Sequence, residues 1–167
     1  MSSPSASADE RAWQAVQLVV FDFDGVLTDN TVYVSGDGVE QVRCWRGDGI
    51  GLSAIERAGI DALVLSTEAN PVVGVRCAKL GIACIQGIPD KRPVLDEVVA
   101  ERGLTLAEVA YVGNDVNDLG CLQGVGLPIV VADAHDDVRA VAAHVTRSPG
   151  GKGAVREVCD RLVAARL

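Results

Sequence analysis

Basic and aromatic side chains are both scarce in this chain. Lys and Arg together number 15 against 23 Asp and Glu, which gives a net charge of -8. Nucleic acids and anionic membrane surfaces attract clustered Lys and Arg, so the composition argues against both as partners. Aromatic residues make up only 4% of the sequence, whereas hydrophobic residues make up 49%. The core must therefore be built from Val, Leu, Ile and Ala, and a chain of this length can fold around it without disulfides or metal.

The cysteines and the N-terminal residues also exclude several classes of protein. Five cysteines lie far apart and form no C-x-x-C pair, which is typical of reduced, mostly buried thiols in a cytosolic protein. Residues 1–10 lack the apolar core of a signal peptide, and no apolar run is long enough to span a membrane. We therefore expect a cytoplasmic protein with a disordered leader over residues 1–12 and a single domain over residues 13–167.

Short apolar runs alternate with helical patterns along most of the chain. Each run ends at polar residues or glycine, as buried strands do. Alternating strands and helices indicate right-handed crossovers, and hence an α/β fold with a doubly wound parallel sheet. Sites in such folds lie at the carboxyl ends of the strands. The expected strands are 17–21, 61–65, 82–86, 108–112 and 128–131, and the expected helices are 49–58, 71–80, 91–102, 138–143 and 153–165.

One segment, Thr31 to Cys44, interrupts this alternation. Two extended runs flank Ser35-Gly36-Asp37-Gly38, a pattern that predicts a β-hairpin. Because the hairpin follows the first strand, we expect it to project from the sheet, where it could cover a site or contact another subunit.

Two carboxylates, Asp22 and Asp24, follow the first predicted strand in the sequence F-D-F-D-G-V-L-T-D. Uncompensated charge is costly there, so the pair requires a cation, and oxygen ligands of this kind suit Mg²⁺. Asp22 can attack phosphorus to form an acyl-phosphate, while Asp24 can protonate the leaving oxygen and later activate water. A D-x-D-G sequence alone also occurs in simple turns and calcium loops, so the assignment depends on further motifs.

Three further motifs follow in order. A hydroxyl pair, Ser66-Thr67, comes after the next strand, Lys91 begins a helix in P-D-K-R-P, and an acidic cluster G-N-D-V-N-D spans 113–118. With these motifs the chain resembles the haloacid dehalogenase superfamily. The resemblance implies that Ser66, or alternatively Thr67, binds a phosphoryl oxygen and that Lys91 neutralises charge on phosphate and on Asp22. It also implies a metal held among Asp22, Asp24, Asn114, Asp115 and Asp118.

Within that superfamily, the hairpin, R-C-A-K-L-G-I at 76–82, I-Q-G-I-P-D-K at 85–91 and G-G-K-G-A-V-R-E at 150–157 resemble one subfamily. It comprises capless phosphatases of 3-deoxy-octulosonate 8-phosphate and nonulosonate 9-phosphates. L-S-T-E-A-N-P-V-V at 65–73 is most similar to the C-terminal domain of bacterial acylneuraminate cytidylyltransferases. The resemblance implies a homotetramer built through the hairpins, with a neighbour's residues closing each site.

Two positions depart from the octulosonate phosphatase pattern. That group typically has T-G-R where this chain has Ser66-Thr67-Glu68. Glu68 is similar to the nonulosonate branch, and we expect Glu68 and Lys79 to contact the sugar acid, unless both are ordinary surface charges. The second departure is Asn114, where the superfamily usually has a metal-binding Asp. Asn offers a neutral oxygen, and Asp115 or Asp118 could compensate for the lost charge.

Two further basic residues are candidates for substrate contact by resemblance. Arg76 lies in the subfamily-like helix, and Arg156 follows the glycine-rich G-G-K-G. Arg156 is explained equally well by a salt bridge at a helix start.

The sequence thus predicts a Mg²⁺-dependent phosphatase acting on a small sugar-acid phosphate. Two rival interpretations remain. One is a non-catalytic oligomerisation module, which Asn114 supports, and the other is a phosphatase for an unrelated phosphate ester, since the motifs describe the phosphoryl chemistry and not the leaving group.

Overall fold

A six-stranded, all-parallel sheet forms the centre of the computed structural model, which describes residues 7–167. Its strand order is β5-β4-β1-β6-β7-β8, so β1 lies in the middle and pairs with β4 on one side and β6 on the other. This arrangement confirms the predicted doubly wound α/β fold. The strands are β1 (Leu18–Phe21), β4 (Asp61–Leu65), β5 (Ala83–Ile85), β6 (Val109–Gly113), β7 (Leu127–Val130) and β8 (His144–Val145).

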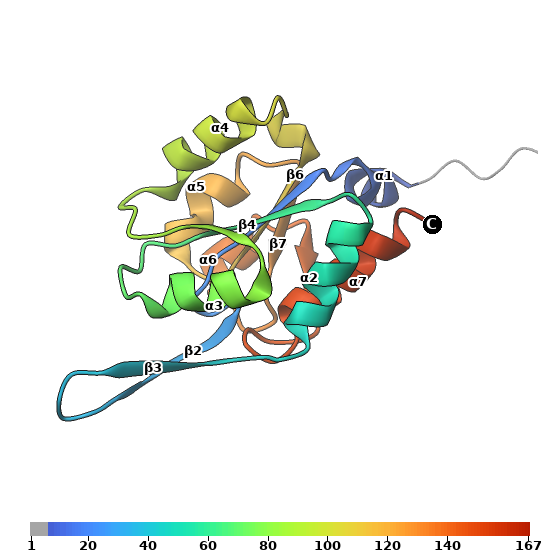
Figure 1. Cartoon of the computed structure of the whole chain (residues 1–167). Helices are drawn as coiled ribbons and strands as arrows, with labels where there is room; N and C mark the ends of the chain where they lie inside the picture. Colours follow the sequence, from blue (N-terminus) through green and yellow to red (C-terminus); the bar gives the residue numbers. More distant parts are fainter. Residues whose placement is uncertain (1–6) are drawn as a thin grey trace, which may run out of the picture.

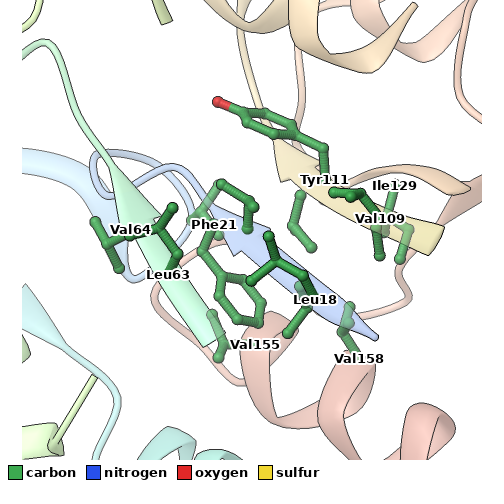
Figure 2. Packing of buried hydrophobic residues seen from close by; sticks show 14 of the residues in the cluster. Leu18, Phe21, Leu63, Val64, Val109, Tyr111, Ile129, Val155 and Val158 are labelled. Carbon is green, nitrogen blue, oxygen red and sulfur yellow. The ribbon is translucent and has the colours of Figure 1, made fainter. Parts of the chain in front are cut away.

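Helices cover both faces of this sheet (Figure 1). Helices α2 (Asp48–Arg57) and α7 (Ala154–Ala164) lie side by side on one face, and α4 (Lys91–Glu101) and α5 (Leu119–Leu122) lie on the other. Figure 2 shows Phe21 of β1 on the side of the sheet that faces Val155 and Val158 of α7, with the Tyr111 ring on the opposite side. The remaining helices are α3 (Val72–Leu80), α6 (Asp136–Arg139) and the 3-10 turns η1 (Leu106–Glu108) and η2 (Val116–Asp118).

The order of the strands places a topological switch point beside β1. The chain runs from β1 to β4 and β5 on one side and then crosses back to β6 on the other. In register, Phe21 at the end of β1 pairs with Val64 and with Val112. The residues that follow these strands, Asp22, Ser66 and Asn114, therefore meet at one edge of the sheet, where such folds bind their ligands.

The predicted hairpin is present as a separate two-stranded antiparallel sheet that projects from the body (Figure 1). Its strands are β2 (Thr28–Val34) and β3 (Glu40–Cys44), so it begins three residues before the predicted start at Thr31. Apolar side chains near its tip are exposed, with Tyr33 at 63% and Val34 at 64% of their full surface.

The expectation of a disordered leader over residues 1–12 is wrong for its second half. Helix α1 spans Ala8–Ala15, and Ser7 caps it by accepting a hydrogen bond from Glu10 N (3.1 Å). Trp13 is fully buried, packs edge-on against His144, and lies under the Arg161 guanidinium. These tertiary contacts hold the helix on the domain. Residues 1–6 of the expected leader lie outside the described residues.

Two smaller predictions also need correction. The helix expected at 138–143 is α6, which starts at Asp136 because His135 Nδ1 accepts from Asp137 N (3.2 Å). The two-residue strand β8 was not predicted at all. Within residues 7–167, no helix is both long and apolar enough to cross a membrane.

A buried carboxylate joins α2 to α7. Asp48, at the first turn of α2, is only 1% exposed, and its Oδ1 accepts from Arg156 N at 3.1 Å. Burial raises the pKa of Asp48 to about 7, although the Arg156 hydrogen bond and the charges of Arg76 and Arg156 oppose the rise. The neutral acid is therefore the form that the folded state favours.

We predict that Asp48→Asn weakens the dependence of stability on pH. A carboxyl whose pKa is higher in the folded than in the unfolded state costs stability as pH rises from about 4 to about 7. Asn keeps the acceptor and removes this cost. The free energy of unfolding of the variant should exceed that of the wild type by a margin that grows by roughly 1 kcal/mol per pH unit up to pH 7 and is constant above it.

Urea unfolding at pH 5, 6, 7 and 8 measures this margin. Glu97→Gln, which removes a carboxylate from an exposed position on α4, is the control and should run parallel to the wild type. Parallel curves for wild type and Asp48→Asn would contradict the prediction.

Candidate active site

The loop after β1 turns back so that Asp22 faces the carboxyl edge of the sheet. Asp22 is 4% exposed, and its Oδ1 accepts a hydrogen bond from Phe23 N (2.7 Å). Thr28 Oγ1 closes the loop by accepting from Gly25 N (3.1 Å) and Asn30 N (3.2 Å). Gly25 has φ +82°, and a Cβ there would overlap the Asn114 amide, so only glycine fits.

Lys91, at the first turn of α4, neutralises the centre of the site. Its side chain is 1% exposed, and its Nζ lies 2.7 Å from Asp22 Oδ1 and 2.8 Å from Asp118 Oδ1. Burial alone would lower the pKa of Lys91, but the two carboxylates raise it, so the ammonium stays charged. Lys91 thus lies against Asp22, where it can neutralise that carboxylate, and its role toward phosphate stays a prediction.

Asp118 occupies a different place from the one predicted. It is completely buried, and its Oδ1 accepts from both Lys91 Nζ and Tyr111 OH (2.6 Å). Its Oδ2 accepts from Asn114 N (2.9 Å) and Asp115 N (3.4 Å). With both oxygens engaged in this way, Asp118 anchors Lys91 and the loop after β6, and the structure does not present it as a metal ligand.

The two aspartates after β1 differ in environment. Burial raises the pKa of Asp22 to about 7, helped by the nearby Asp118 charge and opposed by Lys91. Burial also raises the pKa of the partly buried Asp24, with Glu68 adding to the rise, Lys91 opposing it and Glu40 adding to it again. Asp24 is thereby suited to carry a proton that it can donate.

Asn114 completes the group of oxygens beside Asp22. Its side-chain amide lies 3.0 Å from Asp22 Oδ2 and 3.0 Å from the main-chain oxygen of Asp24. These groups line a cavity of about 110 Å³ together with Asn30, Thr67, Asp115 and Asn117. Asn30 and Asn117 were missed by sequence reasoning, although both lie within or directly after the motifs, and Asn30 adopts a left-handed φ of 64°.

A hard cation fits this cavity. The Asn114 amide lies 3.0 Å from both Asp22 Oδ2 and Asp24 O, and carboxylate, carbonyl and amide oxygens are what Mg²⁺ binds. No cluster of three or more His, Cys, Asp or Glu able to hold a metal exists among residues 7–167. Of the predicted five-residue set, the structure brings together one carboxylate, one carbonyl and one amide, with Asp115 at the wall of the cavity, and the metal ligands themselves stay a prediction.

Ser66 and Thr67 both follow β4, but only one of them lines the cavity. Ser66 is 1% exposed, and its Oγ accepts from Glu68 N (3.1 Å), which leaves its own proton free to donate. Thr67 is exposed and lines the cavity beside Asp22. The structure thus brings both predicted hydroxyls to the edge where Asp22 lies.

The predicted substrate residues Arg76 and Lys79 line a separate groove between β3 and α3. The groove has a volume of about 400 Å³ and also contains Arg46, a residue that sequence reasoning missed. Arg76 Nη2 donates to Trp45 O (3.4 Å), while its buried Nε has no hydrogen-bond partner. Cys44 lines the same groove, and the charges of Arg76 and Asp24 both act on its pKa, which burial raises. The groove therefore lies close to Asp24. Its remaining walls are Val42, Val72 and Val75.

Glu68 does not line this groove, and its charge acts on Asp24. Its Oε1 accepts from Asn70 N (2.7 Å), and its charge is the second cause, after burial, of the raised pKa of Asp24. Its carboxylate therefore holds the turn into α3 and lies close enough to Asp24 to act on its charge.

Arg156 does not reach the site of its own chain. Its Nε lies 2.8 Å from Asp160 Oδ1, and it lines a different cavity of about 620 Å³ with His144 and Arg147. The salt bridge that the sequence offered as an alternative is therefore present.

The glycines before Arg156 support the Asp22 loop instead. Gly151 N donates to Val26 O (3.0 Å), and a Cβ at Gly150 would lie 1.8 Å from Gly25 O. The close approach of the two backbones requires glycine at that position.

The geometry agrees with known proteins. A family described as haloacid dehalogenase-like hydrolase matches residues 85–158. The 3-deoxy-D-manno-octulosonate 8-phosphate phosphatase KdsC of Escherichia coli (strain K12) is 36% identical over 90% of this chain and 81% of its own. The chain therefore belongs to the haloacid dehalogenase-like hydrolases and, within them, to the phosphatases of the KdsC type.

Solved structures agree with this assignment. A haloacid dehalogenase family hydrolase from Streptomyces avermitilis is 47% identical, with a TM-score of 0.87 over 89% of this chain and 85% of its own. The 3-deoxy-D-manno-octulosonate 8-phosphate phosphatase from Moraxella catarrhalis is 32% identical, with a TM-score of 0.91 over 94% of this chain and 91% of its own. That structure contains a magnesium ion, a phosphate ion and a KDO molecule.

Proposed function

We propose that this protein is a Mg²⁺-dependent phosphatase that hydrolyses a sugar-acid phosphate through an aspartyl-phosphate. The observation that carries the proposal is the placing of Asp22, whose carboxylate is held between Lys91 and the Asn114 amide at the wall of a cavity shared with Asp24. A nucleophile fixed in this way, with an acid beside it, is what phosphoryl transfer requires.

In the first step, a carboxylate oxygen of Asp22 forms a bond to phosphorus as the bond to the leaving oxygen breaks. Asp24 donates its proton to that oxygen, for which its raised pKa suits it. Lys91 neutralises charge on Asp22 and on the phosphoryl group, and a hydroxyl from Ser66, or alternatively Thr67, binds a phosphoryl oxygen.

In the second step, Asp24 accepts a proton from water, which attacks phosphorus and releases phosphate from Asp22. Mg²⁺ would be held by Asp22, the Asp24 carbonyl and Asn114, and it would neutralise the phosphoryl oxygens. The Tyr111 and Lys91 contacts of Asp118 keep the ammonium aimed at Asp22 throughout.

The groove beside Asp24 suits the acid end of the substrate. Arg46, Arg76 and Lys79 give its walls three positive charges, while Val42, Val72 and Val75 give it apolar surface for a carbon chain. The Arg76 guanidinium, at the wall of the groove, can donate to a carboxylate. Glu68, whose charge acts on Asp24, would accept hydrogen bonds from sugar hydroxyls. We therefore expect the substrates to be 3-deoxy-octulosonate 8-phosphate or nonulosonate 9-phosphates, including those of sialic acid metabolism.

A second copy of the chain suits the exposed hairpin. Val32, Tyr33, Val34 and Val39 expose apolar surface on a ribbon that stands away from its own domain (Figure 1). Surfaces of this kind usually mark an interface. We propose a homotetramer built through these hairpins, in which a neighbouring subunit closes each site. We propose further that the enzyme is cytoplasmic and has no nucleic-acid or membrane partners.

Phosphate release with Mg²⁺ from a panel of sugar-acid phosphates tests the reaction. We expect turnover on nonulosonate or octulosonate phosphates and a loss of at least about 1000-fold in Asp22→Asn, which lacks the nucleophile. Ser66→Ala and Thr67→Ala show by their relative losses which hydroxyl binds phosphate. Absence of turnover on every ester, with an intact fold and metal bound, would favour the oligomerisation module instead.

Substrates with and without a carboxylate test whether the groove binds the acid end of the substrate. Arg76→Ala and Lys79→Ala should raise KM for a sugar-acid phosphate by about tenfold each, because a charged hydrogen bond is lost. The same variants should leave hydrolysis of p-nitrophenyl phosphate, which has no carboxylate, within about twofold. Arg57→Ala, at an exposed position on α2, is the control. Equal losses on both substrates would contradict this assignment.

The assembly is tested by light scattering after gel filtration. The wild type should show four times the mass of one chain, and Val34→Asp should give smaller species because a charge is then buried in the interface. Ala100→Asp introduces the same charge at an exposed position on α4, outside the hairpin and the cavity lining, and should leave the mass unchanged. A monomeric wild type would contradict the proposal.

A further inference from the structure

Hydrogen bonds hold the main chain of Asn114 on both sides. Its main-chain N donates to Asp118 Oδ2 (2.9 Å), and its main-chain O accepts from His135 N (2.8 Å). The residue is 7% exposed. Rotation of the amide about its own axis exchanges nitrogen and oxygen while leaving the rest of the residue in place.

The two orientations of this amide have opposite chemistry. With nitrogen toward the site, Nδ2 donates to Asp24 O (3.0 Å) and to Asp22 Oδ2 (3.0 Å), and each of these buried oxygens gains a donor. With oxygen toward the site, three acceptors face one another at that spacing, which is unfavourable unless a cation lies among them.

The spacing itself matches such a cation. Adjacent ligands of an octahedral Mg²⁺, at bond lengths of about 2.1 Å and right angles, are about 3.0 Å apart. The observed separations of 3.0 Å between the amide and these two oxygens therefore suit the metal-bound and the hydrogen-bonded arrangement equally.

We propose that the Asn114 amide turns over when Mg²⁺ binds. In the metal-free protein it is a hydrogen-bond donor that holds Asp22 and Asp24 in place, and in the metal-bound protein it is an oxygen ligand. The proposal rests on the Mg²⁺ site of the proposed function. Its consequence is that the metal-free site is already organised, while Mg²⁺ must displace two hydrogen bonds and gains only a neutral ligand.

Asn114→Asp separates these two effects, because Asp has the same shape but cannot donate in its ionised form. Titration calorimetry with Mg²⁺ alone should show binding about tenfold or more tighter than in the wild type, since a charged ligand replaces a neutral one and no hydrogen bonds are lost. In EDTA the same variant should unfold at lower urea concentration than the wild type, because acceptors then face one another.

Asn117→Asp is the matched control. It adds the same charge to the wall of the same cavity, but no hydrogen bond to Asp22 or Asp24 depends on it. It should change Mg²⁺ binding by no more than about threefold and leave stability in EDTA unchanged.

The wild-type protein offers a check that does not depend on the variant folding. In a ¹⁵N-resolved spectrum, the Asn114 side-chain NH₂ pair, identified by its absence in Asn114→Asp, should exchange slowly in EDTA and faster when Mg²⁺ is added. Tighter binding with lower metal-free stability, or this change in exchange, supports the proposal. Unchanged or weaker binding in Asn114→Asp, or an NH₂ pair unaffected by bound Mg²⁺, would overturn it. A protein that binds Mg²⁺ in this way but hydrolyses no ester would contradict only the proposed function.

Discussion

The buried ammonium of Lys91 is the interaction around which the site is organised. It joins Asp22, at the end of β1, to Asp118, after β6, and it comes from the start of α4. Two carboxylates this well buried would repel each other without it, and an unpaired buried charge is costly. Three segments far apart in sequence are thereby fixed at one point, and the direction of the Asp22 carboxylate follows from that point.

Much of the fold could be predicted because the apolar runs and their polar ends are local signals. Asp22, Ser66 and Asn114 follow three neighbouring strands, so their convergence follows from a parallel sheet. The hairpin could also be predicted, from its turn sequence. The position of α1 was not, because its stability comes from Trp13 packing against His144 and Arg161, contacts that no local pattern reveals.

The roles within the acidic cluster were harder to predict for a related reason. The sequence shows that Asn114, Asp115 and Asp118 share a loop. Which carboxylate turns into the domain depends on the hydrogen-bond and ion-pair donors that other segments place there. Tyr111 and Lys91 donate hydrogen bonds to Asp118, whereas the Asn114 amide faces Asp22. Arg156 is similar, since its helix carries an acceptor one turn later in Asp160.

The close backbone packing of Gly150 and Gly151 on the loop that carries Asp22 has a consequence for how the protein is made. During synthesis that loop emerges before the strands beside β1, and long before the glycines that pack on it. A chain that has not yet reached Gly150 therefore carries Asp22 without the backbone that holds its loop in place. The geometry of the site is completed only after these glycines have been synthesised and packed.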